Sequence, residues 1–179
     1  MTYTIDKSEF LVYTDNEVII MLVRFNIGNF LSFKNVHEFS MIAGKVRSKS
    51  SRLYEGNNIK LLKFSSIFGA NASGKSNLIK SIDYAQSTIL QGFRKTWNVS
   101  PFKINNADKN KASYFEFEIL INDIIYAYGF EVLLEQNCFV SEWLMELHPN
   151  GMDKKIFYRD ITQGVFNSDL NIKTYFSTF

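Results

Sequence analysis

The stretch GANASGKS, residues 69–76, decides how this chain folds. It fits G-x-x-x-x-G-K-[ST] at every constrained position, which is the pattern of a phosphate-binding loop between a strand and a helix. Gly69 and Gly74 let the backbone turn and approach phosphate oxygens without a Cβ in the way. The successive N–H groups from Asn71 to Ser76 can then point at an anion, which the positive end of the following helix also attracts.

Two side chains of this loop supply the charge and the metal ligand that a nucleotide needs. Lys75 provides a point charge for the β- and γ-phosphates. The Ser76 hydroxyl is the expected ligand of Mg²⁺, because this ion prefers hard oxygen donors. The loop therefore predicts ATP and Mg²⁺ as cofactors, and a plain strand-to-helix turn is the alternative.

The segments on either side of the loop have the patterns that such a loop requires. Residues 60–68, KLLKFSSIF, predict a buried strand that runs directly into the loop. Residues 76–91 predict an amphipathic helix, and Gly92 fits its C-terminal end. The apolar face of this helix is expected to consist of Leu78, Ile82, Ala85 and Ile89.

The N-terminal part of the chain predicts two strands and a long loop. Residues 18–27 read as a buried strand, and residues 30–39 as a second strand after a turn. Residues 43–58 are rich in Ser, Gly, Asn, Lys and Arg, which favours a loop with or without a short helix. Residues 1–20 are either an upstream extension or an extra edge strand.

The second half of the chain predicts an antiparallel sheet, over about residues 113–170. Residues 113–121 and 124–134 both alternate apolar and polar side chains around a two-residue polar turn, which is typical of a β-hairpin. Residues 139–147 and 155–159 predict further strands, separated by a Pro-Asn-Gly turn. The aromatic stripes of the hairpin, like Trp97 and Trp143, are expected to be packing residues. The fold class is therefore mixed α/β, or α+β.

Composition limits the class of protein. The chain has 179 residues, 46% of them hydrophobic and 21% charged, which is enough to bury a core. Its net charge of +2 gives no general argument for nucleic acid. The single cysteine, Cys138, predicts a buried thiol in a reducing compartment. Since neither an apolar run of membrane length nor a signal-peptide pattern occurs, we expect a soluble cytoplasmic protein with no membrane partner.

The extended loop GANASGKSN resembles the Walker A motif of the ABC-type ATPases of the SMC, RecF and OLD-like group, G-x-N-x-x-G-K-S-N. The upstream IGNFLSFK, residues 27–34, resembles the first strand and turn of that group. Four further segments are similar to one subset of this group, the bacterial AAA-type, abortive-infection-like ATP-binding proteins linked to anti-phage defence. These segments are EFSMIAGK (residues 38–45), PFK (101–103), FEFEI (115–119) and YGFEV (128–132). The resemblance covers roughly residues 21 to 160.

This resemblance implies that residues 21–179 form the N-terminal lobe of an ABC-type P-loop ATPase. It places Asn71 beside the γ-phosphate, gives Asn77 the role of bracing the loop, and puts Ser32 and Phe33 near the base or ribose. The predicted nucleotide-binding residues are Gly69, Ala70, Asn71, Ala72, Ser73, Gly74, Lys75, Ser76 and Asn77, with Ser76 as the Mg²⁺ ligand.

The residues that would cut ATP are not found in the sequence. A Walker B strand ends in Asp-Glu, and this dipeptide does not occur in the chain. Glu116, Glu118 and Asp123 stand in alternating or turn contexts, and no L-S-x-G-type signature follows the loop. His37 and His148 read as surface or core residues. We therefore assign no catalytic residue and expect ATPase activity only when a C-terminal lobe completes the site.

Several partners and alternatives follow. The resemblance implies these partners: ATP, the C-terminal lobe or a second subunit, a second copy in a homodimer, and a nuclease effector. A truncated gene, a split gene or an excised fragment would explain why only one lobe is present. DNA is a weaker candidate, because a basic cluster of this kind is more often part of a solvated loop: Lys45, Arg47, Lys49 and Arg52. The alternative functions are a truncated remnant or nucleotide-binding module without turnover, and a P-loop small-molecule kinase, which would continue with parallel βαβ units.

Overall fold

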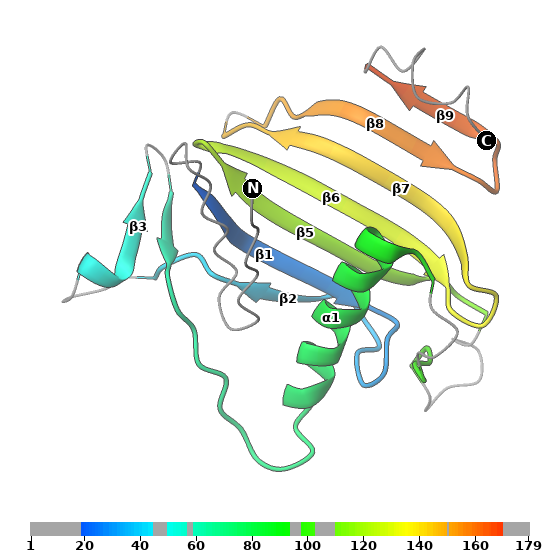
Figure 1. The fold of residues 1–179 in the computed structure, drawn as a ribbon, viewed down its shortest axis with the longest axis horizontal. Helices are drawn as coiled ribbons and strands as arrows, with labels where there is room; N and C mark the ends of the chain where they lie inside the picture. Colours follow the sequence, from blue (N-terminus) through cyan, green and yellow to red (C-terminus); the bar gives the residue numbers. More distant parts are fainter. Residues whose placement is uncertain are drawn as a thin grey trace.

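A seven-stranded antiparallel sheet and a 17-residue helix are the main elements of the part of the chain that the structure describes (Figure 1). The computed structural model describes residues 19–44, 50–56, 59–93, 98–102, 110–149 and 151–169. The sheet has the order β2-β1-β5-β6-β7-β8-β9, and β3 pairs with β4 in a second, two-stranded sheet. The elements are β1 (Ile20–Gly28), β2 (His37–Ser40), the 3₁₀ turn η1 (Ser50–Arg52), β3 (Leu53–Glu55), β4 (Lys60–Leu62), α1 (Lys75–Gln91), β5 (Ser113–Ile121), β6 (Ile124–Leu133), β7 (Cys138–Leu147), β8 (Lys154–Asp160) and β9 (Val165–Ser168).

The predicted hairpin and the antiparallel meander are confirmed. β5 and β6 pair from Ser113↔Val132 to Ile121↔Ile124. The turn between them, Asn122-Asp123, has φ of 48° and 64°, as a two-residue hairpin turn with two left-handed residues requires. β7 and β8 also form where the sequence predicts strands, whereas the short edge strand β9 was not predicted.

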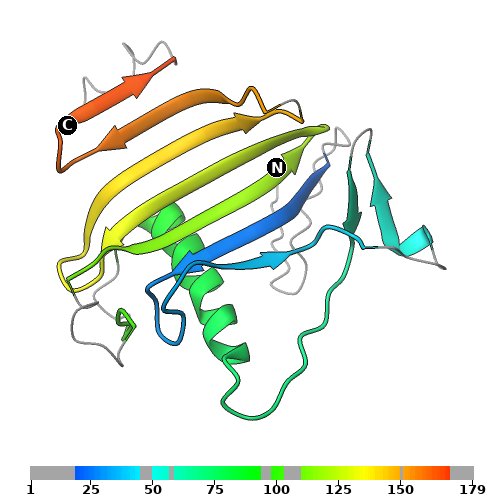
Figure 2. The same cartoon turned by 180° about the vertical axis from the view of Figure 1, so that it is seen from behind.

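The sheet buries side chains on both faces. On one face, which α1 crosses, the phenylalanines of β1, β5 and β6 pack with Ile82, Tyr84 and Ala85 of the helix (Figures 1 and 2). A smaller cluster of Met21, Val23, Leu61 and Leu120 joins the sheet to the two-stranded sheet. The two clusters can share β1 because alternate residues of a strand point to opposite faces.

The strand predicted over residues 30–39 is wrong over residues 30–36. Phe30 and Phe33 exchange backbone hydrogen bonds of 3.0 and 2.8 Å, which closes a tight turn. Leu31 within this turn has a φ of 50°. The chain can enter β2 only at His37, where it pairs with Ile27 of β1.

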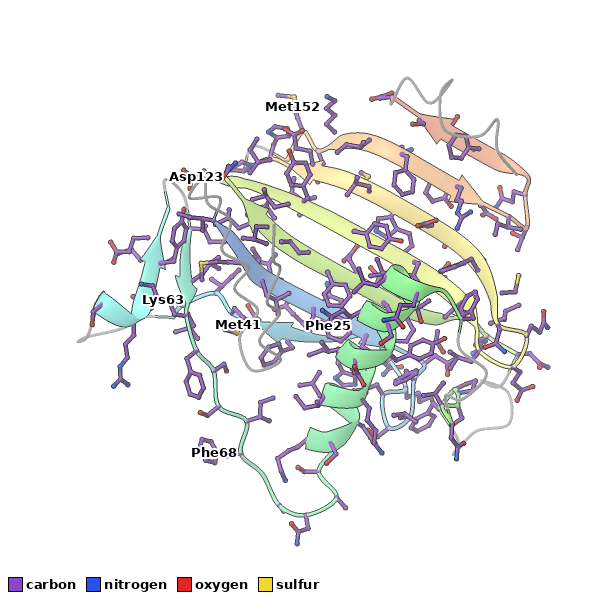
Figure 3. The ribbon with its side chains drawn as sticks, viewed as in Figure 1. Phe25, Met41, Lys63, Phe68, Asp123 and Met152 are labelled. Atoms are coloured by element: carbon purple, nitrogen blue, oxygen red, sulfur yellow. The ribbon has the colours of Figure 1, made fainter. Side chains whose placement is uncertain are left out.

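The buried strand predicted over residues 60–68 is also wrong, because only Lys60–Leu62 is a strand. β4 pairs with β3, a strand that the sequence did not predict within the expected loop. Beyond it Phe64 is 77% and Phe68 is 90% exposed, and Figure 3 shows Phe68 on the segment that leads from β4 down to α1. The apolar pattern is present, but no described strand lies beside residues 64–68 to bury it.

The predicted helix is confirmed, while its predicted face is partly wrong. Gly92 ends α1 with a φ of 72°, and its N–H donates to Thr88 O at 3.0 Å. Ile89 was expected in the core but is 40% exposed. The face of α1 that packs on the sheet includes polar residues that the apolar pattern did not indicate. The buried residues of the helix are Ser81, Ile82, Tyr84, Ala85 and Thr88.

The prediction that the Cys138 thiol is buried is wrong, whereas the packing role of Trp143 is confirmed. Cys138 begins β7 with an exposed side chain, because the neighbouring Phe139 is the residue that turns to the core. Trp143 packs on Tyr114, with ring centroids 5.4 Å apart. Trp97 and residues 1–18 lie outside the described residues. No helix in the described part of the chain is long and apolar enough to span a membrane.

Candidate functional site

The glycine loop leads directly into the first turn of α1. Helical hydrogen bonding begins with Leu78 N, which donates to Gly74 O at 3.0 Å. Before it, Ser73 N donates to Ala70 O at 3.2 Å, and Ala72 between them has a φ of 64°. The loop is therefore a compact turn placed at the positive end of a 17-residue helix.

Both motif glycines stand where a larger residue would disturb the loop. A Cβ on Gly69 would lie 2.7 Å from Ser73 Oγ, which is too close for a carbon. Gly74 has a φ of 96°, a left-handed conformation that side chains rarely adopt. A Cβ there would also lie 3.4 Å from Ser32 Oγ. Gly69 is therefore required for space and Gly74 for its backbone conformation.

Lys75 folds back over the loop that precedes it. Its Nζ donates to Gly69 O and Ala70 O, both at 2.7 Å, and lies 3.4 Å from Ser73 Oγ. The ammonium group is thus held against the carbonyl oxygens of the loop backbone. A phosphate that enters the loop would meet this charge and compete with the two carbonyls for it.

The remaining predicted residues flank this lysine. Asn71 and Ser76 have exposed side chains, and so both are accessible to a ligand. Asn77 Nδ2 donates to Ser32 Oγ at 3.0 Å, so the turn after β1 touches the start of α1. The sequence did not predict this contact, which joins residues 45 positions apart. Phe33 is half-buried and packs against the core.

The three acids considered for catalysis are engaged in holding the sheet together. Glu116 and Glu118 alternate with the buried phenylalanines of β5, so they lie on the face opposite α1. Burial raises the pKa of the Glu118 carboxyl above its usual value, and the nearby Arg24 guanidinium offsets only part of this increase. Within the described ranges no group of three or more His, Cys, Asp or Glu side chains could hold a metal. The acids accept hydrogen bonds from Asn26 and Trp143 (to Glu116), Arg24 (to Glu118) and Tyr54 (to Asp123).

Of the four basic residues named as a possible DNA contact, the structure describes only Arg52. Arg52 ends η1 and is exposed. Lys45, Arg47 and Lys49 lie outside the described residues. The structure therefore adds no support to nucleic-acid binding by this loop.

The family comparison matches residues 64–178, which include the glycine loop, α1 and the sheet from β5 onward. The matching family is described as "AAA domain, putative AbiEii toxin, Type IV TA system". The chain belongs to this family. It is thus an AAA-type domain of a P-loop ATPase family, and the matched residues include the loop at the start of α1. No curated protein and no solved structure matches the chain. The narrower relation to the SMC, RecF and OLD-like group stays a prediction.

Proposed function

We propose that this domain binds ATP with Mg²⁺ as the N-terminal lobe of an ABC-type ATPase head, in a system of the abortive-infection type that acts against phage. The observation that carries the proposal is the P-loop itself, with Lys75 held by two carbonyls across the loop at the start of α1. In this arrangement the loop N–H groups and Lys75 bind the phosphates, and Ser76 binds Mg²⁺. Asn71 contacts the γ-phosphate.

The domain binds ATP and does not hydrolyse it unless a second lobe or subunit completes the site. Glu116, Glu118 and Asp123 accept structural hydrogen bonds, and no Asp-Glu pair occurs in the sequence. The exposed Phe64 and Phe68 before the loop support a completing partner, since apolar side chains this exposed favour coverage. That partner is a C-terminal lobe or a second subunit. Closure of a homodimer on ATP would then act on a nuclease effector, with DNA as a further candidate ligand.

Two other functions are considered. A nucleotide-binding module without turnover uses the same P-loop and differs only in never meeting a completing lobe. A P-loop small-molecule kinase is disfavoured, because the strands that follow α1, β5 to β9, pair only antiparallel to one another, whereas such kinases continue with parallel βαβ units.

Equilibrium titration with a fluorescent ATP analogue, followed by displacement with ATP, ADP and AMP, tests the proposal. We expect displacement to weaken as phosphates are removed, and Lys75→Ala to reduce affinity by about 10- to 100-fold, since one charge-assisted contact is lost. Ser76→Ala should abolish the Mg²⁺ dependence of binding. Turnover by this chain alone that Lys75→Ala removes would contradict the incomplete-site proposal. Equal binding by Lys75→Ala would contradict nucleotide binding at the loop.

A further inference from the structure

We propose that the turn after β1, residues 28–33, is a positioning element of the P-loop: Ser32 fixes the start of α1, and Asn29 fixes the turn. This inference rests on the proposed nucleotide binding and names what holds that site in shape. Neither residue is proposed to touch the reacting phosphates.

The first step is the contact between the turn and the helix start. Ser32 Oγ accepts a 3.0 Å hydrogen bond from Asn77 Nδ2, and it lies 3.4 Å from the place where a Cβ of Gly74 would be. Gly74 is the residue at which the loop becomes helix. Ser32 therefore lies against the junction whose N–H groups are the ones expected to bind phosphate.

The second step is a second contact between the same turn and the same helix. Phe30 is fully buried, and its ring centroid is 5.3 Å from that of Tyr84. Tyr84 follows Asn77 by seven residues, which is two helical turns, so both lie on one side of α1. The turn thus holds the helix at two levels, through an apolar contact in the core and a polar contact at the loop.

The third step is the anchoring of the turn by Asn29. This residue is buried and has a φ of 48°, a left-handed conformation that asparagine tolerates. Its Nδ2 donates to Lys111 O at 2.9 Å, and its Oδ1 accepts from Phe102 N at 3.1 Å. Its backbone carbonyl accepts from Ser113 Oγ at 2.5 Å. Through its side chain and its backbone carbonyl, this one residue therefore joins the turn to Phe102 and to residues 111–113.

A further backbone bond ties the turn to the same neighbour. Leu31 N donates to Ser100 O at 3.0 Å. Leu31 and Asn29 are thus both held by residues 98–102, while Ser32 reaches the other way, to Asn77. The turn is fixed on one side by the sheet and the segment after α1, and on the other side it fixes the P-loop. Nucleotide affinity is expected to depend on it.

The test compares Ser32→Ala, Ser32→Thr and the control Ser51→Ala, an exposed serine of η1, by titration with the fluorescent ATP analogue. Ser32→Ala removes one hydrogen bond, so affinity should fall by about 2- to 10-fold. Ser32→Thr keeps the hydroxyl and should restore it. The thermal midpoint without nucleotide should be unchanged. In a double-mutant cycle, Ser32→Ala should have no further effect in an Asn77→Ala background.

Amide hydrogen exchange gives a readout that does not depend on turnover. Ser32→Ala should speed exchange at residues 74–78 in the nucleotide-free protein, and Asn29→Gly, which keeps the left-handed backbone, should speed it at Leu31 and Phe102. If Lys75→Ala abolishes binding while Ser32→Ala binds as tightly as the wild type, this inference is wrong and the proposed function stands. If the wild type binds no nucleotide, both are wrong.

Discussion

Gly129 shows how a single residue can decide the packing of one face of the sheet. It pairs with Glu116 on one side and Trp143 on the other. Because glycine has no side chain, the indole of Trp143 can lie over β6 and donate from Nε1 to Glu116 Oε2 at 2.8 Å. A Cβ at residue 129 would lie 2.3 Å from Trp143 Cζ2, so the indole would have to leave this position.

Gly129→Ala should therefore lower the free energy of unfolding by about 1–3 kcal/mol, the usual effect of overpacking. Gly44→Ala is the matched control, since a Cβ there has nothing within 4 Å. Urea denaturation followed by tryptophan fluorescence measures both. Equal unfolding free energies for the two variants would contradict the packing described for Trp143.

Predictability from sequence also differs from residue to residue. Gly69, Gly74 and Lys75 could be placed because a local motif fixes their geometry. The roles of Asn29 and Ser32 could not be found this way, because their partners lie 73 and 45 positions away in the chain. A turn was expected at residues 28–29, and nothing in its local pattern indicates which segments it joins.

At the level of the elements, α1 formed where periodicity predicted it, but with a different buried face. A periodic pattern locates a helix well, whereas the sheet decides which stripe is covered. Here the aromatic ring of Tyr84 packs on Phe30 and Phe115, whereas Ile89 is 40% exposed. The hairpin of β5 and β6 was easier to predict, since alternation and turn residues both act locally.

Two isoleucines of α1 test this face directly. Ile82 is 7% exposed, so Ile82→Ala should lower the free energy of unfolding by about 2–4 kcal/mol. Ile89 is 40% exposed, and Ile89→Ala should cost less than about 1 kcal/mol. Thermal or urea denaturation of the two variants measures the difference. If Ile89→Ala lowers the free energy of unfolding more than Ile82→Ala does, Ile89 is part of the buried face, as the sequence predicted.

For the molecule as a whole, the segment between β4 and α1 is where sequence and structure disagree most. Its pattern is that of a buried strand, yet Phe64 and Phe68 are largely exposed. A central strand needs neighbours on both sides, and the described part of the chain places none beside residues 64–68. The sequence pattern indicates that residues 64–68 are suited to a buried strand, whereas burial also requires neighbouring strands.

Replacing both side chains, Phe64→Ser with Phe68→Ser, should therefore raise solubility and reduce binding of a dye that reports exposed apolar surface. The free energy of unfolding should change by less than about 0.5 kcal/mol, because neither ring is packed. Static light scattering, dye fluorescence and urea denaturation measure the three quantities. Marked destabilisation would mean that the rings are buried in solution.

The central claim is that the loop of residues 69–77 holds the phosphates of a nucleotide. Calorimetric titration of the wild-type domain with ATP in the presence of Mg²⁺ tests it most directly, with Lys75→Ala titrated in parallel. We predict one ATP bound per chain by the wild type and an affinity about 10- to 100-fold weaker in Lys75→Ala, with unchanged thermal unfolding of the variant. Identical binding curves for the two proteins, or no binding by the folded wild type, would contradict the claim.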